Sequence, residues 1–193
     1  KGFKKVTGEL PDLPTEAQGN VWVAEVSGRF LTLYDSEGLL PRARSDGFIP
    51  LSGGSRDTLH FPEGRLKNWP NLEDVEIAVR PHHAWILNIL PLTSVDKESR
   101  IARTAIDATY AMNRLHFLKD TESCWVENVL EELDEPGEWA LNTKEGKLYL
   151  WPRGESPVMA PRLLELIRLE GAIDMEGPED LPVRNLRFRG LTF

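Results

Sequence analysis

Apolar and polar residues follow strand-length patterns near the start of the chain. Residues 21–26 (VWVAEV) and 29–34 (RFLTLY) are separated by Ser-Gly, which predicts a β-hairpin. Residues 35–38 (DSEG) are typical of a turn, after which residues 39–44 resume an extended pattern. Residues 46–62 are rich in Gly, Ser, Asp and Pro and predict a long loop.

The middle of the chain carries three further strand-like segments. Residues 75–79 (VEIAV) alternate, and residues 85–90 (WILNIL) predict a second strand that Pro91 ends. Residues 100–107 predict a third strand. A helix over residues 98–112 is the alternative, but the β-branched residues in this stretch favour the strand.

One segment has the spacing of an amphipathic helix. Residues 126–133 (VENVLEEL) place apolar side chains at helical intervals, and Pro136-Gly137 would stop the helix. The apolar positions are Val126, Val129, Leu130 and Leu133. A single short helix is therefore predicted in a chain that is otherwise mainly β.

A second hairpin is predicted where residues 139–141 and 147–151 flank a turn with Gly146. Along its second strand, Leu148 and Leu150 share one face, and Tyr149 and Trp151 share the other. These aromatics either pack against the core or form a platform for a sugar. Packing is favoured, because large aromatic side chains mostly serve cores.

The end of the chain has a different pattern. Residues 183–193 (VRNLRFRGLTF) form two short apolar strands around a bend, which is typical of one rung of a right-handed parallel β-helix. Their inward positions are Leu186, Phe188, Leu191 and Phe193. The predicted organisation is an N-terminal arm (1–20), a β-rich barrel or sandwich (21–175), a linker (176–182) and this rung. One rung cannot bury its own apolar face, so residues 183–193 are expected either to pair with residues near Phe3 to Val6 or to self-associate.

Composition narrows the classes of function. The net charge is −8 over 193 residues, which argues against nucleic-acid binding, because phosphate recognition needs clustered Lys and Arg. No apolar run approaches the ~18 residues of a membrane-spanning helix. Cys124 is the sole cysteine, so an internal disulfide is impossible and a buried thiol is expected. Gly53-Gly54 lacks the Lys-Ser/Thr of a phosphate loop, and no cofactor is predicted.

Four residues are candidates for contact with a sugar. Arg42 and Arg44 lie two apart on an extended segment and would project to one side, where they suit a carboxylate. Ion pairing with the chain's own acidic residues is the alternative. Trp69 and Trp85 have the flat apolar rings that stack on sugars, with burial in the core as the alternative.

Neither a metal site nor a catalytic pair is predicted. Adjacent histidines on a strand point to opposite faces, so His82 and His83 make a poor metal site with His60 and His116. Positions on the surface or in loops are favoured for these histidines. Among 31 Asp and Glu residues, many pairs would satisfy the spacing of glycosidase carboxylates, so spacing identifies none. The densest acidic set is expected on the solvated side of the predicted helix: Glu127, Glu131, Glu132, Asp134, Glu135 and Glu138.

The chain resembles a known family in two stretches. Residues 126–139 (VENVLEELDEPGEW) and 148–152 (LYLWP) are similar to a signature of bacterial right-handed parallel β-helix proteins. These proteins include the family-141 glycoside hydrolases, known for fucosidase and xylanase activity. Residues 39–44 (LLPRAR) resemble the family stretch that follows a short hairpin.

The resemblance implies a β-rich domain inserted near the start of a β-helix, whose catalytic carboxylates lie on later rungs. It therefore implies a secreted or periplasmic parent hydrolase and no catalytic residue in this chain. The implied function is a non-catalytic accessory domain that walls or lids a glycan-binding groove. An independent carbohydrate-binding module and a purely structural brace are the alternatives.

Overall fold

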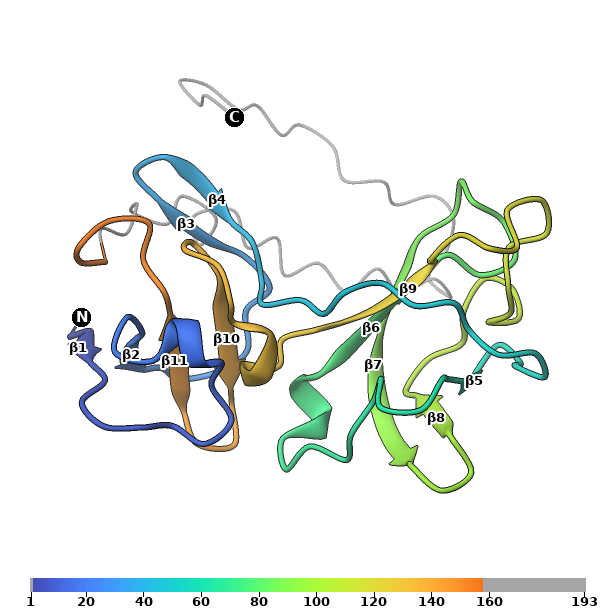
Figure 1. Cartoon of the computed structure of the whole chain (residues 1–193), viewed down its shortest axis with the longest axis horizontal. Coiled ribbons are helices and arrows are strands. Elements are labelled where there is room, and N and C mark those ends of the chain that lie inside the picture. Colours follow the sequence, from blue (N-terminus) through green and yellow to red (C-terminus); the bar gives the residue numbers. More distant parts are fainter. Residues whose placement is uncertain (1, 158–193) are drawn as a thin grey trace, which may run out of the picture. The chain divides into compact units, whose positions relative to one another are not determined.

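The chain is mainly β in the computed structural model, which describes residues 2–157 (Figure 1). Within these residues the strands form a four-stranded, a two-stranded and a five-stranded sheet, all antiparallel, and no sheet closes into a barrel. Helical structure there consists of three 3₁₀ turns, η1 (Thr15–Ala17), η2 (Leu72–Asp74) and η3 (Leu130–Glu132). The predicted linker 176–182 and rung 183–193 lie outside the described residues.

The four-stranded sheet joins the start of the chain to the predicted second hairpin. Its order is β1 (Lys4–Lys5), β2 (Trp22–Glu25), β11 (Lys147–Leu150) and β10 (Trp139–Asn142). β10 and β11 form the predicted hairpin, and Gly146 in its turn has a positive φ of 65°. The predicted hairpin of residues 21–26 with 29–34 is wrong, because β2 pairs with β1 and β11.

A tight turn at residues 35–38 explains why residues 29–34 do not pair with residues 21–26 as predicted. The two-stranded sheet pairs β3 (Leu33–Asp35) with β4 (Gly38–Leu40). The Asp35 carboxylate accepts hydrogen bonds from the backbone N–H groups of Glu37 and Gly38 at 2.8 and 3.0 Å, which fixes a tight turn. β3 is thereby paired with its immediate successor, and the predicted turn at residues 35–38 is confirmed.

Both faces of the β10–β11 hairpin are covered. Trp139 and Leu141 share one core cluster with Leu148 and Leu150, on one face of the hairpin. On the other face, Tyr149 belongs to a separate cluster, against which the half-buried Trp151 packs. The predicted division of faces is confirmed. The hairpin aromatics serve the core and do not form a sugar platform.

The five-stranded sheet forms the other main core. Its order is β5 (Thr58–His60), β8 (Ile101–Thr104), β7 (Asn88–Asp96), β6 (Glu76–Val79) and β9 (Cys124–Glu127). The strands predicted at 75–79 and 100–107 are confirmed, whereas the predicted loop 46–62 contains β5. Cys124 is buried as expected, and burial raises the pKa of its thiol to about 12.

Pro91 lies inside β7, so the predicted end of that strand is wrong. β7 pairs with β6 up to Pro91 and with β8 from Leu92 onward, with a register shift between Leu92 and Ser94. Proline lacks a backbone N–H and is tolerated where the strand exchanges one partner for another. The carbonyl of Pro91 still accepts a hydrogen bond from the N–H of Ala105 at 2.8 Å.

The helix predicted over residues 126–133 is also wrong. β9 ends at Glu127, and only the 3₁₀ turn η3 follows. Between them Asn128 has a positive φ of 68°, which no α-helix contains. The apolar positions that suggested one helical face belong to two cores: Val126 and Val129 to the five-stranded sheet, Leu133 to the hairpin side.

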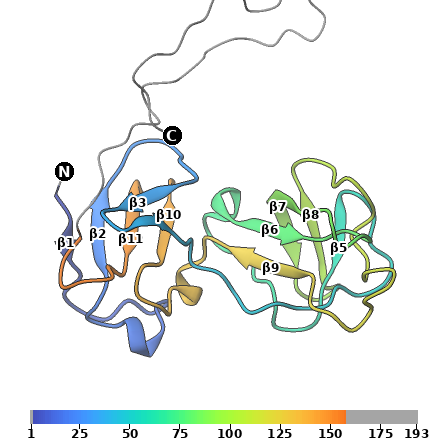
Figure 2. The same cartoon turned by 90° about the horizontal axis from the view of Figure 1, so that it is seen from above.

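An extended segment after β4 links the two large sheets. It forms single bridges from Arg42 to Trp139, from Arg44 to Glu127 and from Phe48 to Cys124. The segment therefore runs beside β10 and then beside β9, as both views show (Figure 1, Figure 2). The stretch that resembled the family motif thus holds together strands of both sheets.

Candidate functional site

Two loops at the five-stranded sheet come together around a group of aromatic rings. The first, residues 80–87, leaves β6 at Pro81 and turns at His82, whose φ is 58°. The second, residues 110–118, precedes β9. The backbone N–H of His116 donates to the carbonyl of His82 at 2.9 Å, so a hydrogen bond ties the loops to each other.

The rings form a continuous chain across both loops. The ring of Trp85 stacks on that of His83, with 4.4 Å between centroids and 19° between planes. His83 meets the edge of Tyr110 at 4.8 Å and that of His82 at 4.5 Å. His116 lies 5.2 Å from His82. Each ring restricts the orientation of the next, so the exposed rings are held in place by neighbours.

A cleft of about 320 Å³ lies among these rings. Its walls are His82, His83, Ala84, Trp85, Leu115, His116, Phe117 and Leu118. Trp85 and Phe117 are 74% and 80% exposed, so large apolar surfaces at the cleft face solvent. The volume lies at the lower end of the range for small-molecule sites. We refer to this site as the aromatic cleft.

The imidazoles of the aromatic cleft influence one another. The pKa of His83 is lowered, first by burial and then by the neighbouring His82 and His116. Its Nδ1 atom is buried and has no hydrogen-bond partner within the described residues. The favoured surface or loop position is confirmed for His82 and His83, since both lie in a loop. No group of three His, Cys, Asp or Glu residues within 2–157 is arranged to hold a metal ion.

Of the four predicted sugar-contacting residues, Trp85 lies in the aromatic cleft. Arg42 is largely buried and forms ion pairs with Glu76 and, at 3.7 Å, with Glu127. Arg29 adds a further contact to Glu76 at 2.9 Å. The guanidinium of Arg42 therefore has carboxylate partners from this chain, which agrees with the predicted alternative of ion pairing with the chain's own acidic residues.

Arg44 and Trp69 also lie outside the lining of the aromatic cleft. The guanidinium of Arg44 is 5.3 Å from the ring centroid of Trp125. The indole N–H of Trp69 donates to both carboxylate oxygens of Glu131 at 3.1 Å, and its ring packs against the five-stranded core. A role for Arg42, Arg44 or Trp69 in sugar contact stays a prediction.

Sequence reasoning missed most of the aromatic cleft. Tyr110, His116 and Phe117 gave no motif, and the cleft depends on a loop-to-loop contact between segments about thirty residues apart. A usable signal was present in residues 81–85 (PHHAW). A proline followed by two imidazoles and an indole suits an exposed turn that displays rings better than a strand.

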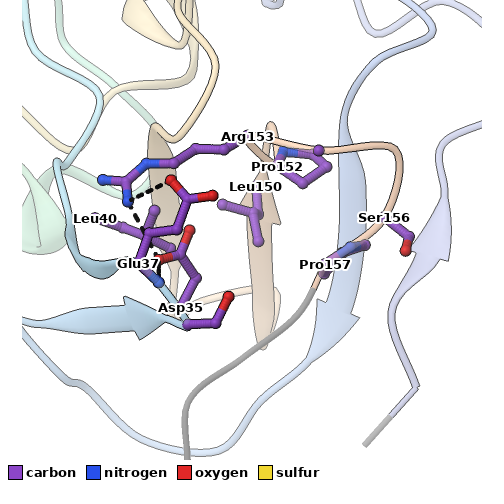
Figure 3. A pocket seen from close by; sticks show the side chains of 10 residues that line it. Asp35, Glu37, Leu40, Leu150, Pro152, Arg153, Ser156 and Pro157 are labelled. Atoms are coloured by element: carbon purple, nitrogen blue, oxygen red, sulfur yellow. Dashed lines mark hydrogen bonds and ion pairs between the residues drawn. The ribbon is translucent and has the colours of Figure 1, made fainter.

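A second hollow lies beside β4 and β11 (Figure 3). Its volume is about 100 Å³, well below that of small-molecule sites. In Figure 3 the guanidinium of Arg153 reaches the carboxylates of Asp35 and Glu37, at 3.2 and 3.8 Å. Arg153 also donates to the carbonyl of Leu39 at 3.0 Å. These contacts fix the β3–β4 hairpin to the segment after β11, which is a structural role.

One carboxyl group has the raised pKa that general acids need. Burial raises the pKa of Glu138 to about 7. Its carboxylate, however, accepts hydrogen bonds from the N–H groups of Asp134 and Glu135 at 3.0 and 3.2 Å, and it lines neither hollow. Glu138 thus braces the turn before β10. Its expected place on a solvated helix face is wrong, since it is 7% exposed.

Comparison with known proteins gives one informative match. No family model and no curated protein matches the chain. A solved structure described as "Glycoside hydrolase" is similar, with a TM-score of 0.55 and 19% sequence identity. The match covers 83% of this chain but 30% of that one, so this chain corresponds to about a third of the larger protein. At this identity the likeness shows the fold. No helix within residues 2–157 is long and apolar enough to cross a membrane.

Proposed function

We propose that the chain is a non-catalytic accessory domain of a larger, secreted or periplasmic carbohydrate-active protein, and that its aromatic cleft contacts the glycan. The similarity in fold to part of a glycoside hydrolase supports the carbohydrate context. In this proposal the domain lies beside the groove of a parallel β-helix. The catalytic carboxylates belong to the rest of that protein.

The single observation that carries the proposal is the exposed indole of Trp85. Burying a large apolar side chain contributes about 1.5–3 kcal/mol to stability, and Trp85 leaves most of that unrealised. The ring is nevertheless oriented by its stack on His83. An exposed, oriented aromatic ring is suited to the apolar face of a sugar, because stacking there needs little loss of side-chain freedom.

An independent carbohydrate-binding module is the second candidate. The chain of mutually oriented rings favours it, because such a site would bind glycan without help from a neighbouring groove. The two candidates differ in a measurable way. A module binds oligosaccharide as the isolated chain with full affinity, whereas an accessory wall gains affinity when the rest of the parent protein is present.

Binding is tested by titrating the full chain with neutral and acidic oligosaccharides in a calorimeter. We expect Trp85→Ala to weaken binding at least tenfold, since covering a large apolar side chain contributes about 1.5–3 kcal/mol and about 1.4 kcal/mol is a factor of ten. The matched control is Leu31→Ala, which removes an apolar side chain that is 56% exposed and outside the cleft. Equal affinities of the two variants would exclude the aromatic cleft as the glycan site.

The accessory role also predicts that the chain alone hydrolyses no glycoside. Assays with aryl fucosides, aryl xylosides and plant polysaccharides measure this directly. Turnover that disappears when a single carboxylate of the chain is replaced by its amide would contradict the non-catalytic assignment. Glu138→Gln is the first variant to make in that case, because Glu138 alone combines burial with a pKa of about 7 among the described residues.

A further inference from the structure

The charge around the aromatic cleft differs from that of the chain as a whole. The chain holds 31 acidic residues against 23 basic ones. Yet residues 80–95 and 108–119, which supply both loops, contain no Asp or Glu. They contain Arg80, Arg114 and Lys119, all exposed. The walls of the cleft contribute three imidazoles and no acidic side chain. An anion in the cleft therefore meets no carboxylate among the lining residues.

The imidazoles also provide suitable hydrogen-bond donors. A neutral imidazole donates through one ring nitrogen, and an imidazolium donates through both. The ring centroids of His83 and His116 lie 4.5 and 5.2 Å from that of His82. The three rings therefore repel one another when more than one of them is protonated. A bound anion removes this penalty, because it attracts each protonated ring.

We propose that the ligand of the aromatic cleft is an acidic glycan, with one sugar stacked on Trp85 and its anionic group held by the imidazoles of His82, His83 and His116. The inference rests on the proposed function, since it names the class of glycan for the same site. A uronic acid carboxylate and a sulfate ester share the required chemistry. Both accept hydrogen bonds from several donors at once.

The proposal has a defined pH dependence. The titratable groups that line the cleft are the imidazoles of His82, His83 and His116. Tyr110 is the other titratable ring in contact with them. The anion binds the protonated rings best, so affinity is highest at low pH and falls as pH rises.

The experiment compares uronate oligomers with their carboxyl-reduced counterparts, using calorimetry on the full chain at pH 5.5 and 7.5. Trimers of galacturonate, glucuronate and mannuronate serve as probes, and a sulfated galactan oligomer forms a separate arm. We expect at least one acidic oligomer to bind at least tenfold more tightly than its neutral counterpart at pH 5.5. That preference should shrink at pH 7.5, because a neutral imidazole attracts an anion less than a protonated one does.

Substitutions test separately whether a sugar stacks on Trp85 and whether the imidazoles bind the anionic group. Trp85→Ala should weaken acidic and neutral ligands alike, whereas His116→Gln should remove only the preference for the acidic ligand and its pH dependence. His60→Gln is the control, since His60 lies in β5 and outside the cleft. If only the sulfated oligomer is preferred over neutral ligands, the anion site is supported and its ligand is a sulfate ester.

Three results would overturn the inference. Equal affinity for acidic and neutral oligomers removes the acidic preference but leaves glycan binding intact. If His116→Gln still prefers the acidic oligomer to the same extent, the imidazoles do not cause that preference. Absence of binding to any oligomer, acidic or neutral, overturns the proposed function together with the inference.

Discussion

The β10–β11 hairpin and the aromatic cleft use the same kinds of side chain in opposite ways. In the hairpin, Trp139 is fully buried and Tyr149 nearly so. In the cleft, Trp85 and Phe117 remain mostly exposed. The rings of both regions are oriented by neighbouring rings: Trp139 stacks on Phe30 at 5.4 Å, much as Trp85 stacks on His83. Orientation alone therefore does not distinguish a core from a site.

The difference lies in what covers the ring. The hairpin has a sheet neighbour and a core cluster on each face, so its aromatics contribute their apolar area to folding. The cleft loops project from the five-stranded sheet and cover one another only in part. Exposed rings gathered at one cleft are expected to matter for binding, because contiguous exposed apolar surface often marks an interaction site.

The largest expected effect is on Trp139. Trp139→Ala removes a side chain that is 0% exposed, and it also removes the hydrogen bond from the indole N–H to the carbonyl of Leu40 at 3.1 Å. We expect a loss of about 3–5 kcal/mol in the free energy of unfolding. Urea denaturation measures it. A loss under about 1 kcal/mol would show that the hairpin face is less well packed than described.

The next effect concerns Asn128, which fixes the approach to the same hairpin. Its side chain donates to the carbonyls of Asp74 and Leu141 at 3.0 and 2.8 Å and accepts from the N–H of Leu141 at 2.7 Å. Asn128→Ala leaves these buried groups unpaired and places alanine at a positive φ, for an expected loss of about 2–4 kcal/mol.

Asn128→Gly provides the control for the backbone. Glycine accepts the positive φ, so this variant isolates the lost hydrogen bonds and should be less destabilised than Asn128→Ala by about 1 kcal/mol. If glycine restores wild-type stability in chemical denaturation, the side-chain hydrogen bonds contribute nothing and the assignment of Asn128 as a brace is wrong.

Asn128 also shows where sequence reasoning stops. The periodicity of residues 126–133 correctly identified buried positions but assigned them to one helix, because spacing does not reveal that they belong to two cores. The β10–β11 hairpin was predictable, since its strands are adjacent and Gly146 marks the turn. The pairing of β2 with β11 was not, because it joins residues more than a hundred positions apart.

The candidate site was likewise predictable only in its local features. Trp85 was identified from its residue type alone, which is why Trp69, Arg42 and Arg44 were proposed beside it. The structure places these four in different surroundings, because their partners come from distant strands and turns: Glu131 for Trp69, Glu76 for Arg42. Burial and long-range contacts decide which aromatic is displayed, and a single sequence does not contain them.

A smaller effect is expected from pH on the hairpin side. The pKa of Glu138 is raised to about 7 in the folded chain, against about 4.5 when unfolded, so the folded state holds the proton more tightly. The resulting stabilisation is complete below pH 4.5 and is lost as pH rises through 7. We expect Glu138 to account for a decline of about 1–3 kcal/mol across this window.

Glu138→Gln should flatten that decline, since the amide does not titrate. The matched control is Glu135→Gln, which changes an exposed carboxylate in the same turn and should leave the decline intact. Unfolding free energies from denaturant titrations at pH 4.5, 5.5, 6.5 and 7.5 provide the measurement. An identical slope in the wild type and in Glu138→Gln would assign the pH dependence to other groups.

The smallest expected effect on stability is also the sharpest test of the comparison. Trp85→Ala removes an indole that is 74% exposed, so the free energy of unfolding should change by less than about 0.5 kcal/mol, against the several lost with Trp139→Ala. The same change should cost at least tenfold in glycan affinity. Loss of the cleft indole should then lower glycan affinity but not stability, whereas loss of the hairpin indole lowers stability. A loss of more than about 1 kcal/mol in Trp85→Ala would mean that the indole supports the loop through its stack on His83, and the exposed ring would no longer point to a ligand.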